Sequence, residues 1–149
     1  MTTQNISRDD WILGGIALLL AIVLLFLPWF DISVSAGAFS ASATFPATDA
    51  PDGWLGIFAV LAAVAVIADL GIERLAPHTH VPALRGSRTW TRLILAGAGA
   101  GFVALKFLFH IHFSLFGIIG FYLVVVLAAA LVVLASRARQ APAVHADVV

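Results

Sequence analysis

The sequence lacks cysteine and is poor in charge. Its 149 residues include no Cys, which excludes disulfides, thiolate zinc sites, Cys-ligated clusters and a catalytic thiol. Charged residues make up 11% of the chain, whereas a soluble domain has about 25%. The eight basic and eight acidic residues give a formal net charge of zero. This balance argues against a nucleic-acid partner, which would call for a basic excess.

Catalytic motifs are missing as well. The chain has no HExxH, GxSxG or P-loop pattern. The Ser and Thr residues between positions 31 and 53 have no His or carboxylate at a spacing that indicates nucleophilic catalysis. We therefore expect a protein that is not an enzyme and that carries no cofactor.

Apolar sequence is what the chain has in abundance. Hydrophobic residues make up 62% of it, the mean hydropathy is +1.06, and the apolar residues fall in four long runs. Runs of about 20 apolar residues are typical of membrane-spanning helices, whereas a barrel needs shorter, alternating segments. The sequence predicts an all-α membrane protein with one domain, a bundle of four transmembrane helices. These helices are expected at about residues 11–30, 54–72, 90–109 and 116–135.

The first run, Trp11 to Phe30, has a competing interpretation as a cleaved signal peptide, because small residues follow it. The apolar core of a signal peptide has about 7–15 residues, and this run is nearer 20, so we expect a retained helix. Trp11 and Trp29 would lie about 27 Å apart along that helix. This separation predicts that they occupy the two interfacial aromatic belts of a membrane.

The one long loop covers residues 31–53 and contains no Lys or Arg. Between Ile32 and Phe45, apolar residues alternate with Ser and Thr at a period near two. The alternation predicts a small β-hairpin that turns near Gly37, and a disordered Ser/Ala tether is the alternative. The chain is then expected to return irregularly to the second helix, because prolines bracket the segment 46–51.

The arginines indicate the orientation of the expected bundle. Arg8, the arginines of a second loop at residues 73–89 and those of a C-terminal tail at residues 136–149 all fall at one end. The positive-inside rule then predicts a multi-pass protein of the cell membrane with both termini in the cytoplasm. The 31–53 loop is expected outside.

Charged residues occur inside two of the expected helices near the cytoplasmic face. Asp69 lies about 22 Å along its helix from Trp54, and Arg88 and Arg92 lie at a similar depth on the next helix. We expect Asp69 and Arg92 to form a structural ion pair. A proton or ion relay through Asp69 is the alternative.

The only lysine, Lys106, lies near the opposite face. It can extend its ammonium group to the interface, pair with Asp31 or Asp52 to hold the loop on the bundle, or bind an anionic lipid headgroup. His110 shares its helix face and His112 follows. Lys106, His110, His112 and Asp31 therefore form the candidate ligand-binding cluster. A lone His-x-His pair beside an interface is more typical of hydrated anchors than of a metal site, so we assign no metal.

Small residues form a ladder on the third expected helix. Gly97 and Gly101 make a GxxxG step, and Ala96, Ala100 and Ala104 continue it. Small residues let membrane helices approach closely. We expect Gly97 and Gly101 to pack against another helix, either of this chain or of a partner subunit.

Two short patterns bracket the long loop, LPWF at residues 27–30 and DGWLG at residues 52–56, and an Ala/Val helix follows. This layout resembles small four-span integral membrane proteins of actinobacteria, and the likeness covers mainly Trp11 to Asp69. No activity is assigned to that group. The resemblance therefore implies the topology and no chemistry.

The small size, the glycine-rich face and the lack of catalytic motifs favour an accessory or assembly subunit of a larger cell-envelope or respiratory membrane complex. Its partners would be the lipid bilayer and other membrane subunits, or further copies of itself. The alternative function is a binder or carrier of a lipid headgroup, a quinone or a metal ion. That function would use the Lys106 cluster.

Overall fold

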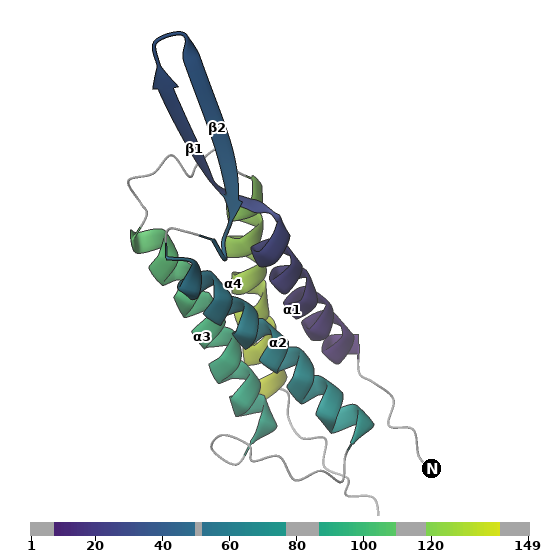
Figure 1. Ribbon diagram of the computed structural model, residues 1–149. Helices are drawn as coiled ribbons and strands as arrows, with labels where there is room; N and C mark the ends of the chain where they lie inside the picture. The colour runs from purple at the N-terminus through teal and green to yellow at the C-terminus, as the bar shows by residue number, and fades with distance from the viewer. Residues whose placement is uncertain (1–7, 50–51, 77–86, 110–118, 141–149) are drawn as a thin grey trace, which may run out of the picture.

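Four helices form a bundle, and a two-stranded antiparallel sheet projects from one end of it (Figure 1). The computed structural model describes residues 8–49, 52–76, 87–109 and 119–140. The elements follow in the order α1 (Arg8–Phe26), β1 (Pro28–Ala36), β2 (Phe39–Pro46), α2 (Gly53–Leu75), α3 (Arg88–Phe109) and α4 (Ile119–Gln140).

Three of the helices, α1, α2 and α3, are long and apolar enough to cross a membrane. Within the described residues, α4 contributes a shorter apolar stretch, Tyr122–Ala138. Large apolar side chains on all four helices point away from the bundle, among them Leu18, Leu61, Ile94 and Val126. A soluble bundle would place polar residues on those faces, so the composition suggests a membrane protein.

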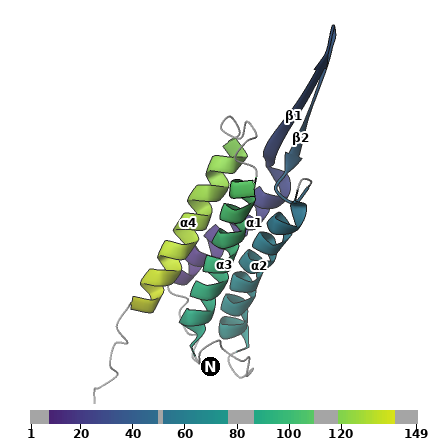
Figure 2. The same cartoon turned by 90° about the vertical axis from the view of Figure 1, so that its left-hand side faces the viewer.

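The helices pack in a closed ring in which α1 contacts α2 and α4, and α3 contacts α2 and α4 (Figure 2). Many of the buried positions that face the centre are alanines, including Ala17, Ala59, Ala63 and Ala96. Alanine lets helix backbones approach closely, and close packing is the main force between helices in lipid.

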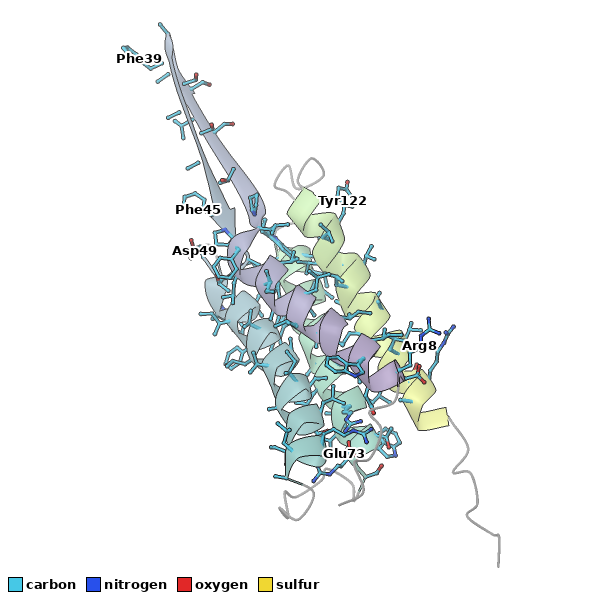
Figure 3. The ribbon with its side chains drawn as sticks, turned by 90° about the vertical axis from the view of Figure 1, so that its right-hand side faces the viewer. Arg8, Phe39, Phe45, Asp49, Glu73 and Tyr122 are labelled. Carbon is cyan, nitrogen blue, oxygen red and sulfur yellow. The ribbon has the colours of Figure 1, made fainter. Side chains whose placement is uncertain are left out.

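The hairpin that the alternation predicts is confirmed. β1 and β2 pair from Ala36↔Phe39 at the turn to Phe30↔Phe45 near the bundle. Gly37 has a φ of 63°, which suits the first position of a two-residue type II′ turn. The hairpin points away from the helices, with Phe39 near its tip and Phe45 near its base (Figure 3).

The first helix is shorter at its C-terminal end than expected. It ends at Phe26 rather than Phe30, because Pro28 cannot continue a helix and begins β1. The chain turns there, and the side chain of Trp29 is buried with 1% exposed. The prediction that Trp29 lies in an interfacial belt is therefore wrong, whereas Trp11 is 68% exposed.

The last helix extends beyond its expected end at residue 135. α4 reaches Gln140, so the first five residues of the expected tail are helical. The segment Ser136–Gln140 has no Gly or Pro, and the hydroxyl of Ser136 donates a hydrogen bond to the carbonyl oxygen of Val133 at 2.7 Å. Residues of this kind continue a helix once packing has started it.

Candidate functional site

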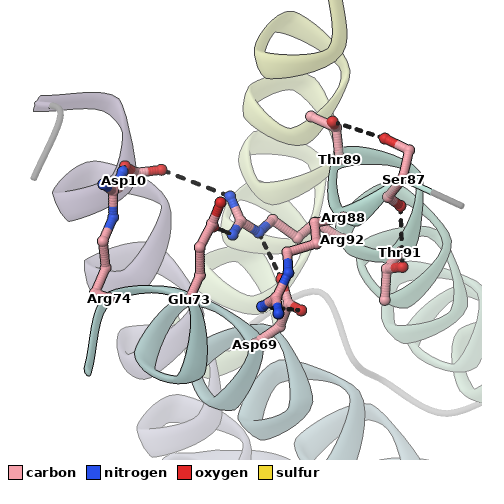
Figure 4. A network of polar contacts seen from close by, with 9 residues as sticks. All are labelled: Asp10, Asp69, Glu73, Arg74, Ser87, Arg88, Thr89, Thr91 and Arg92. Atoms are coloured by element: carbon pink, nitrogen blue, oxygen red, sulfur yellow. Dashed lines mark hydrogen bonds and ion pairs between the residues drawn. The ribbon is translucent and has the colours of Figure 1, made fainter. Parts of the chain in front are cut away.

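An ion-pair network joins α1, α2 and α3 at the end of the bundle opposite the hairpin (Figure 4). Arg92 is at its centre, with a side chain only 7% exposed. Its Nε donates a hydrogen bond to Oδ2 of Asp69 at 2.7 Å, and its Nη2 donates one to Glu73. Its Nη1 lies 3.6 Å from Oδ1 of Asp10 on α1. One guanidinium group thus meets three carboxylates, one from α1 and two from α2.

Two further arginines complete the network. Arg74 donates a hydrogen bond to Oδ2 of Asp10, and Nη1 of Arg88 lies 3.7 Å from Oδ1 of Asp69. Three cations therefore face three anions, and the group is neutral in total. Asp69 and Arg92 were expected to meet and do. Asp10 and Glu73 were not anticipated.

A signal for the wider network was present in the sequence. Asp69 and Glu73 are four residues apart on α2, and Arg88 and Arg92 are four residues apart on α3. Residues at that spacing share a helix face, so two acids face two bases when the helices pack antiparallel. The guanidinium groups hold every carboxylate of the network, which favours a structural role over a proton relay.

At the hairpin end of the bundle, Lys106 is buried with 1% of its side chain exposed. Its Nζ donates hydrogen bonds to the carbonyl oxygens of Ala47, of Asp49 at 3.4 Å and of Asp52 at 3.3 Å. The charges of Asp49 and Asp52 also attract the ammonium group. The expectation that Lys106 extends to the interface is wrong. Instead it ties the segment between β2 and α2 to the last turn of α3.

Glycines let the chain pass closely around this lysine. A Cβ added at Gly56 would overlap the carbonyl oxygen of Ala47, and one at Gly53 would overlap that of Thr48. A Cβ at Gly120 on α4 would overlap the carbonyl oxygen of Pro28. No larger residue fits at these three positions without moving the backbone. We call Trp29, Gly53, Gly56, Lys106 and Gly120 the hairpin socket.

The hairpin socket explains both patterns that bracket the loop. In LPWF, residues 27–30, the proline ends α1 and the tryptophan is buried. In DGWLG, residues 52–56, Asp52 has a left-handed φ of 51° and precedes α2, and both glycines allow close backbone contact. The two patterns therefore meet in space at the base of the hairpin.

Most of the candidate ligand-binding cluster lies outside the described residues. His110 and His112 lie outside them, and so does the side chain of Asp31, whose backbone pairs with Thr44 in the hairpin. Lys106 donates to main-chain carbonyls in the socket. Among the side chains that the structure describes, no group of three His, Cys, Asp or Glu residues could hold a metal ion.

Gly97 and Gly101 do not pack against another helix in the described part of the chain. Both are exposed, and a Cβ on either would meet nothing within 4 Å there. The contact is made by Gly99 instead, where a Cβ would lie 3.3 Å from Cβ of Ala62. The reason is that Arg92 and Lys106, about four helical turns apart, both point inwards and so decide which face of α3 is buried.

Open apolar grooves lie between neighbouring helices. One of about 370 Å³ between α1 and α2 is lined by Gly14, Leu18 and Gly71, with Asp10 and Arg74 at its end. Another of about 410 Å³ separates α3 from α4 and is lined only by apolar side chains. Grooves of this composition suit apolar chains, such as the acyl chains of lipid.

No protein-family model, curated protein or solved structure matches this chain. The features that bear on function are therefore geometric: a neutral network at one end, a socket at the other, and a hairpin that projects from the socket.

Proposed function

We propose that this chain is a non-enzymatic integral membrane protein that presents its β1–β2 hairpin to a partner protein, as an accessory or assembly subunit of a larger membrane complex. One observation carries the proposal. The base of the hairpin is held by a buried lysine, whereas its outer part is covered by nothing in the described chain: Val34 is 63% exposed and Phe39 is 82% exposed.

The orientation follows from the charges. α4 serves as the fourth span in this proposal. The described arginines lie at the network end, where α1 and α3 begin and where α2 and α4 end. At the hairpin end the one described cation is Lys106, which is buried. By the positive-inside rule, the network end faces the cytoplasm together with both termini. The hairpin then stands outside the cell membrane.

The hairpin has two chemically distinct faces. Side chains alternate across a strand, so the register places apolar pairs such as Val34↔Ala41 and Ala36↔Phe39 on one face. The hydroxyl pairs Ser33↔Ser42 and Ser35↔Ser40 lie on the other. An isolated two-stranded hairpin is marginally stable in water, and an apolar face normally packs on something. The helix bundle covers only the base of the hairpin, which leaves the apolar face for a partner.

The reach of the hairpin also favours a protein partner over the membrane surface. The segment 39–45 spans about 20 Å at about 3.3 Å per residue. It continues roughly along the direction of the bundle rather than bending back over it (Figures 1 and 2). A membrane-binding hairpin would lie flat on the headgroups, whereas this one stands above them.

The socket weighs against the alternative function as a ligand binder. Lys106 was the central cation of the candidate cluster, and it is buried with its ammonium group hydrogen-bonded to carbonyl oxygens. A headgroup or quinone would have to displace the β2–α2 segment to reach it. The same contacts would hold the base of the hairpin in place when a partner binds its outer part.

The test is to shorten the hairpin without touching its socket. Deleting residues 33–36 and 39–42 leaves Gly37 and Ala38 as the turn and preserves the face on which each remaining side chain lies. Tagged wild-type and shortened proteins would be isolated from native membranes in mild detergent and compared by quantitative mass spectrometry. We expect a stoichiometric partner with the wild type that is lost, about tenfold or more, with the shortened protein. A monodisperse wild-type protein with no co-purifying protein would refute the proposal.

A further inference from the structure

The outer edge of β2 is unusually open. Edge strands are normally protected from pairing with other chains by Lys, Pro, bulges or covering segments. From Phe39 to Phe45 the strand reads FSASATF, with no charge, no proline and no glycine. The other edge is different, because β1 begins with Pro28, has an irregularity between Pro28 and Phe30, and carries Asp31.

The turn determines which main-chain groups this edge offers. In a two-residue hairpin the pair that closes the turn, here Ala36↔Phe39, exchanges both hydrogen bonds, and the pairs then alternate. Ser40, Ser42 and Thr44 therefore belong to the non-hydrogen-bonded pairs. Their N–H and C=O groups point away from β1 into open space, ready to form a ladder with another strand.

The side chains along the edge indicate what kind of strand fits. On the apolar face, the small Ala41 and Ala43 lie between Phe39 and Phe45, which leaves a shallow seat about four residues long. Large aliphatic side chains of a neighbouring strand would fill that seat. On the opposite face the strand presents hydroxyl groups, which suit uncharged polar residues. The fitting segment is extended, about seven residues long, and alternates aliphatic with uncharged polar side chains.

A second copy of the chain is the first occupant to consider, because FSASATF reads almost the same in both directions around Ser42. That symmetry favours antiparallel pairing of two β2 strands. Two copies with the same orientation in one bilayer, however, are related by rotation about the membrane normal, so their projecting hairpins run parallel. A two-fold axis parallel to two such β2 strands would place each outward N–H opposite the N–H of the same residue in the other copy. No ladder of hydrogen bonds could form between them. Two β2 edges in one membrane therefore cannot pair with each other. A second copy could offer only its β1 edge, which would run antiparallel to β2 but is protected by Pro28, by the irregularity beside it and by Asp31.

We infer that the β2 edge binds an extended strand of another protein, which joins the hairpin as a third strand by β-augmentation. Main-chain hydrogen bonds to Ser40, Ser42 and Thr44 supply the attachment, and the seat between the two phenylalanines selects the aliphatic side chains. The inference rests on the proposed function, because it names the way in which the presented hairpin meets its partner.

The test uses the full chain in its native membrane and a photo-crosslinker at the tip. Phe39→p-benzoylphenylalanine keeps an aromatic ring at an exposed position beside the edge. Into this background we would place Ser42→Pro, which removes an outward N–H of β2, and Ser42→Ala, which keeps it. Ser33→Pro is the matched control, because Ser33 pairs with Ser42 and its N–H points out of the opposite edge. Proline is tolerated at such edge positions.

We expect one protein adduct in the parent, retained in Ser42→Ala and Ser33→Pro and reduced about tenfold in Ser42→Pro. Retention in Ser42→Pro would overturn strand addition and leave the proposed function standing, because the hairpin would then dock through its side chains. Equal loss in both proline variants would overturn the assignment to the β2 edge. An adduct of twice the mass of the chain would identify a second copy and overturn the inference. Absence of any adduct in the parent, together with no co-purifying partner, would refute both proposals.

Discussion

The two ends of the bundle hold their buried cations in different ways. At the network end, Arg92 is surrounded by carboxylates from two other helices, so side chains hold side chains. At the socket end, Lys106 donates to carbonyl oxygens of a connecting segment, so a side chain holds the main chain. Both residues lie on the same face of α3. That helix therefore fastens the bundle at one end and the hairpin at the other.

The structural effect of a buried cation therefore depends on the groups to which it is hydrogen-bonded. A network of side chains distributes its effect over three helices, and losing its centre leaves several like charges together. Losing a lysine that is hydrogen-bonded to carbonyl oxygens should have a local effect, because peptide groups carry no net charge and no like charges are left together. Substitutions at the two ends should therefore differ in the size and the reach of their effects.

Arg92→Met should have the largest effect on global stability. It removes the central cation and leaves Asp10, Asp69 and Glu73 with fewer partners, and breaking a buried ion pair in this way costs about 3–5 kcal/mol. The free energy of unfolding would be measured in detergent or lipid by denaturant titration. Arg137→Met, an exposed arginine at the same end, is the control and should change stability by less than about 0.5 kcal/mol. Similar effects from both variants would show that the network contributes little.

Gly56→Ala should destabilise the hairpin socket through a steric clash. The added methyl group would overlap the carbonyl oxygen of Ala47, which is main chain and cannot rotate away. We expect a loss of about 1–3 kcal/mol and faster proteolysis within the hairpin. Gly97→Ala is the matched control on an open face, and it should be neutral or slightly stabilising. A Gly56→Ala protein as stable as Gly97→Ala would contradict the close contact.

Lys106→Met should loosen the hairpin while the network end stays intact. The thioether fills similar space, but the carbonyl oxygens of Asp49 and Asp52 lose a buried donor, at a cost of about 1–3 kcal/mol. Hydrogen exchange resolved by segment is the measurement. We expect faster exchange at residues 47–56 and unchanged exchange around Arg92. Uniformly faster exchange along the chain would mean that Lys106 supports the whole bundle.

Asp69→Asn should have the smallest effect. The amide oxygen still accepts a hydrogen bond from Arg92, and that arginine keeps Glu73 and Asp10 as ionic partners, so we expect a loss of about 1 kcal/mol. Proton flux into vesicles carrying the wild-type and variant proteins should be equal. Flux in the wild type that is lost in a folded Asp69→Asn protein would support the relay that we consider the alternative.

The sequence-based predictions succeeded where the physical cause is local. Hydropathy summed over about 20 residues predicted the helices, and the alternation between Ile32 and Phe45 predicted the hairpin, because both patterns are properties of a short segment. Pro28 was visible as well. Its effect was underestimated, since the apolar run was extended through a residue that ends a helix.

The face of α3 that packs into the bundle could not be predicted from the sequence in the same way. Its charged residues Arg92 and Lys106 lie on the buried face, whereas apolar residues such as Leu108 point outwards, so the usual rule that the apolar face is buried does not apply to this helix. The ladder drew attention to Gly97 and Gly101, whereas the inward face is set by Arg92 and Lys106 meeting their partners at opposite ends. Whether the outward glycines pack against a partner subunit stays a prediction.

The amino-acid sequence alone predicted the helices and the hairpin and suggested a membrane protein, because long apolar runs and one uncharged alternating segment are properties of local stretches. The burial of Lys106 and Trp29 and the close approach of residues 47–48 to Gly53 and Gly56 follow from the tertiary structure. Some of these contacts join residues far apart in the sequence, such as Ala47 and Lys106. The energies of these contacts depend on which backbone segments come close to each other, and no single segment of the sequence specifies this.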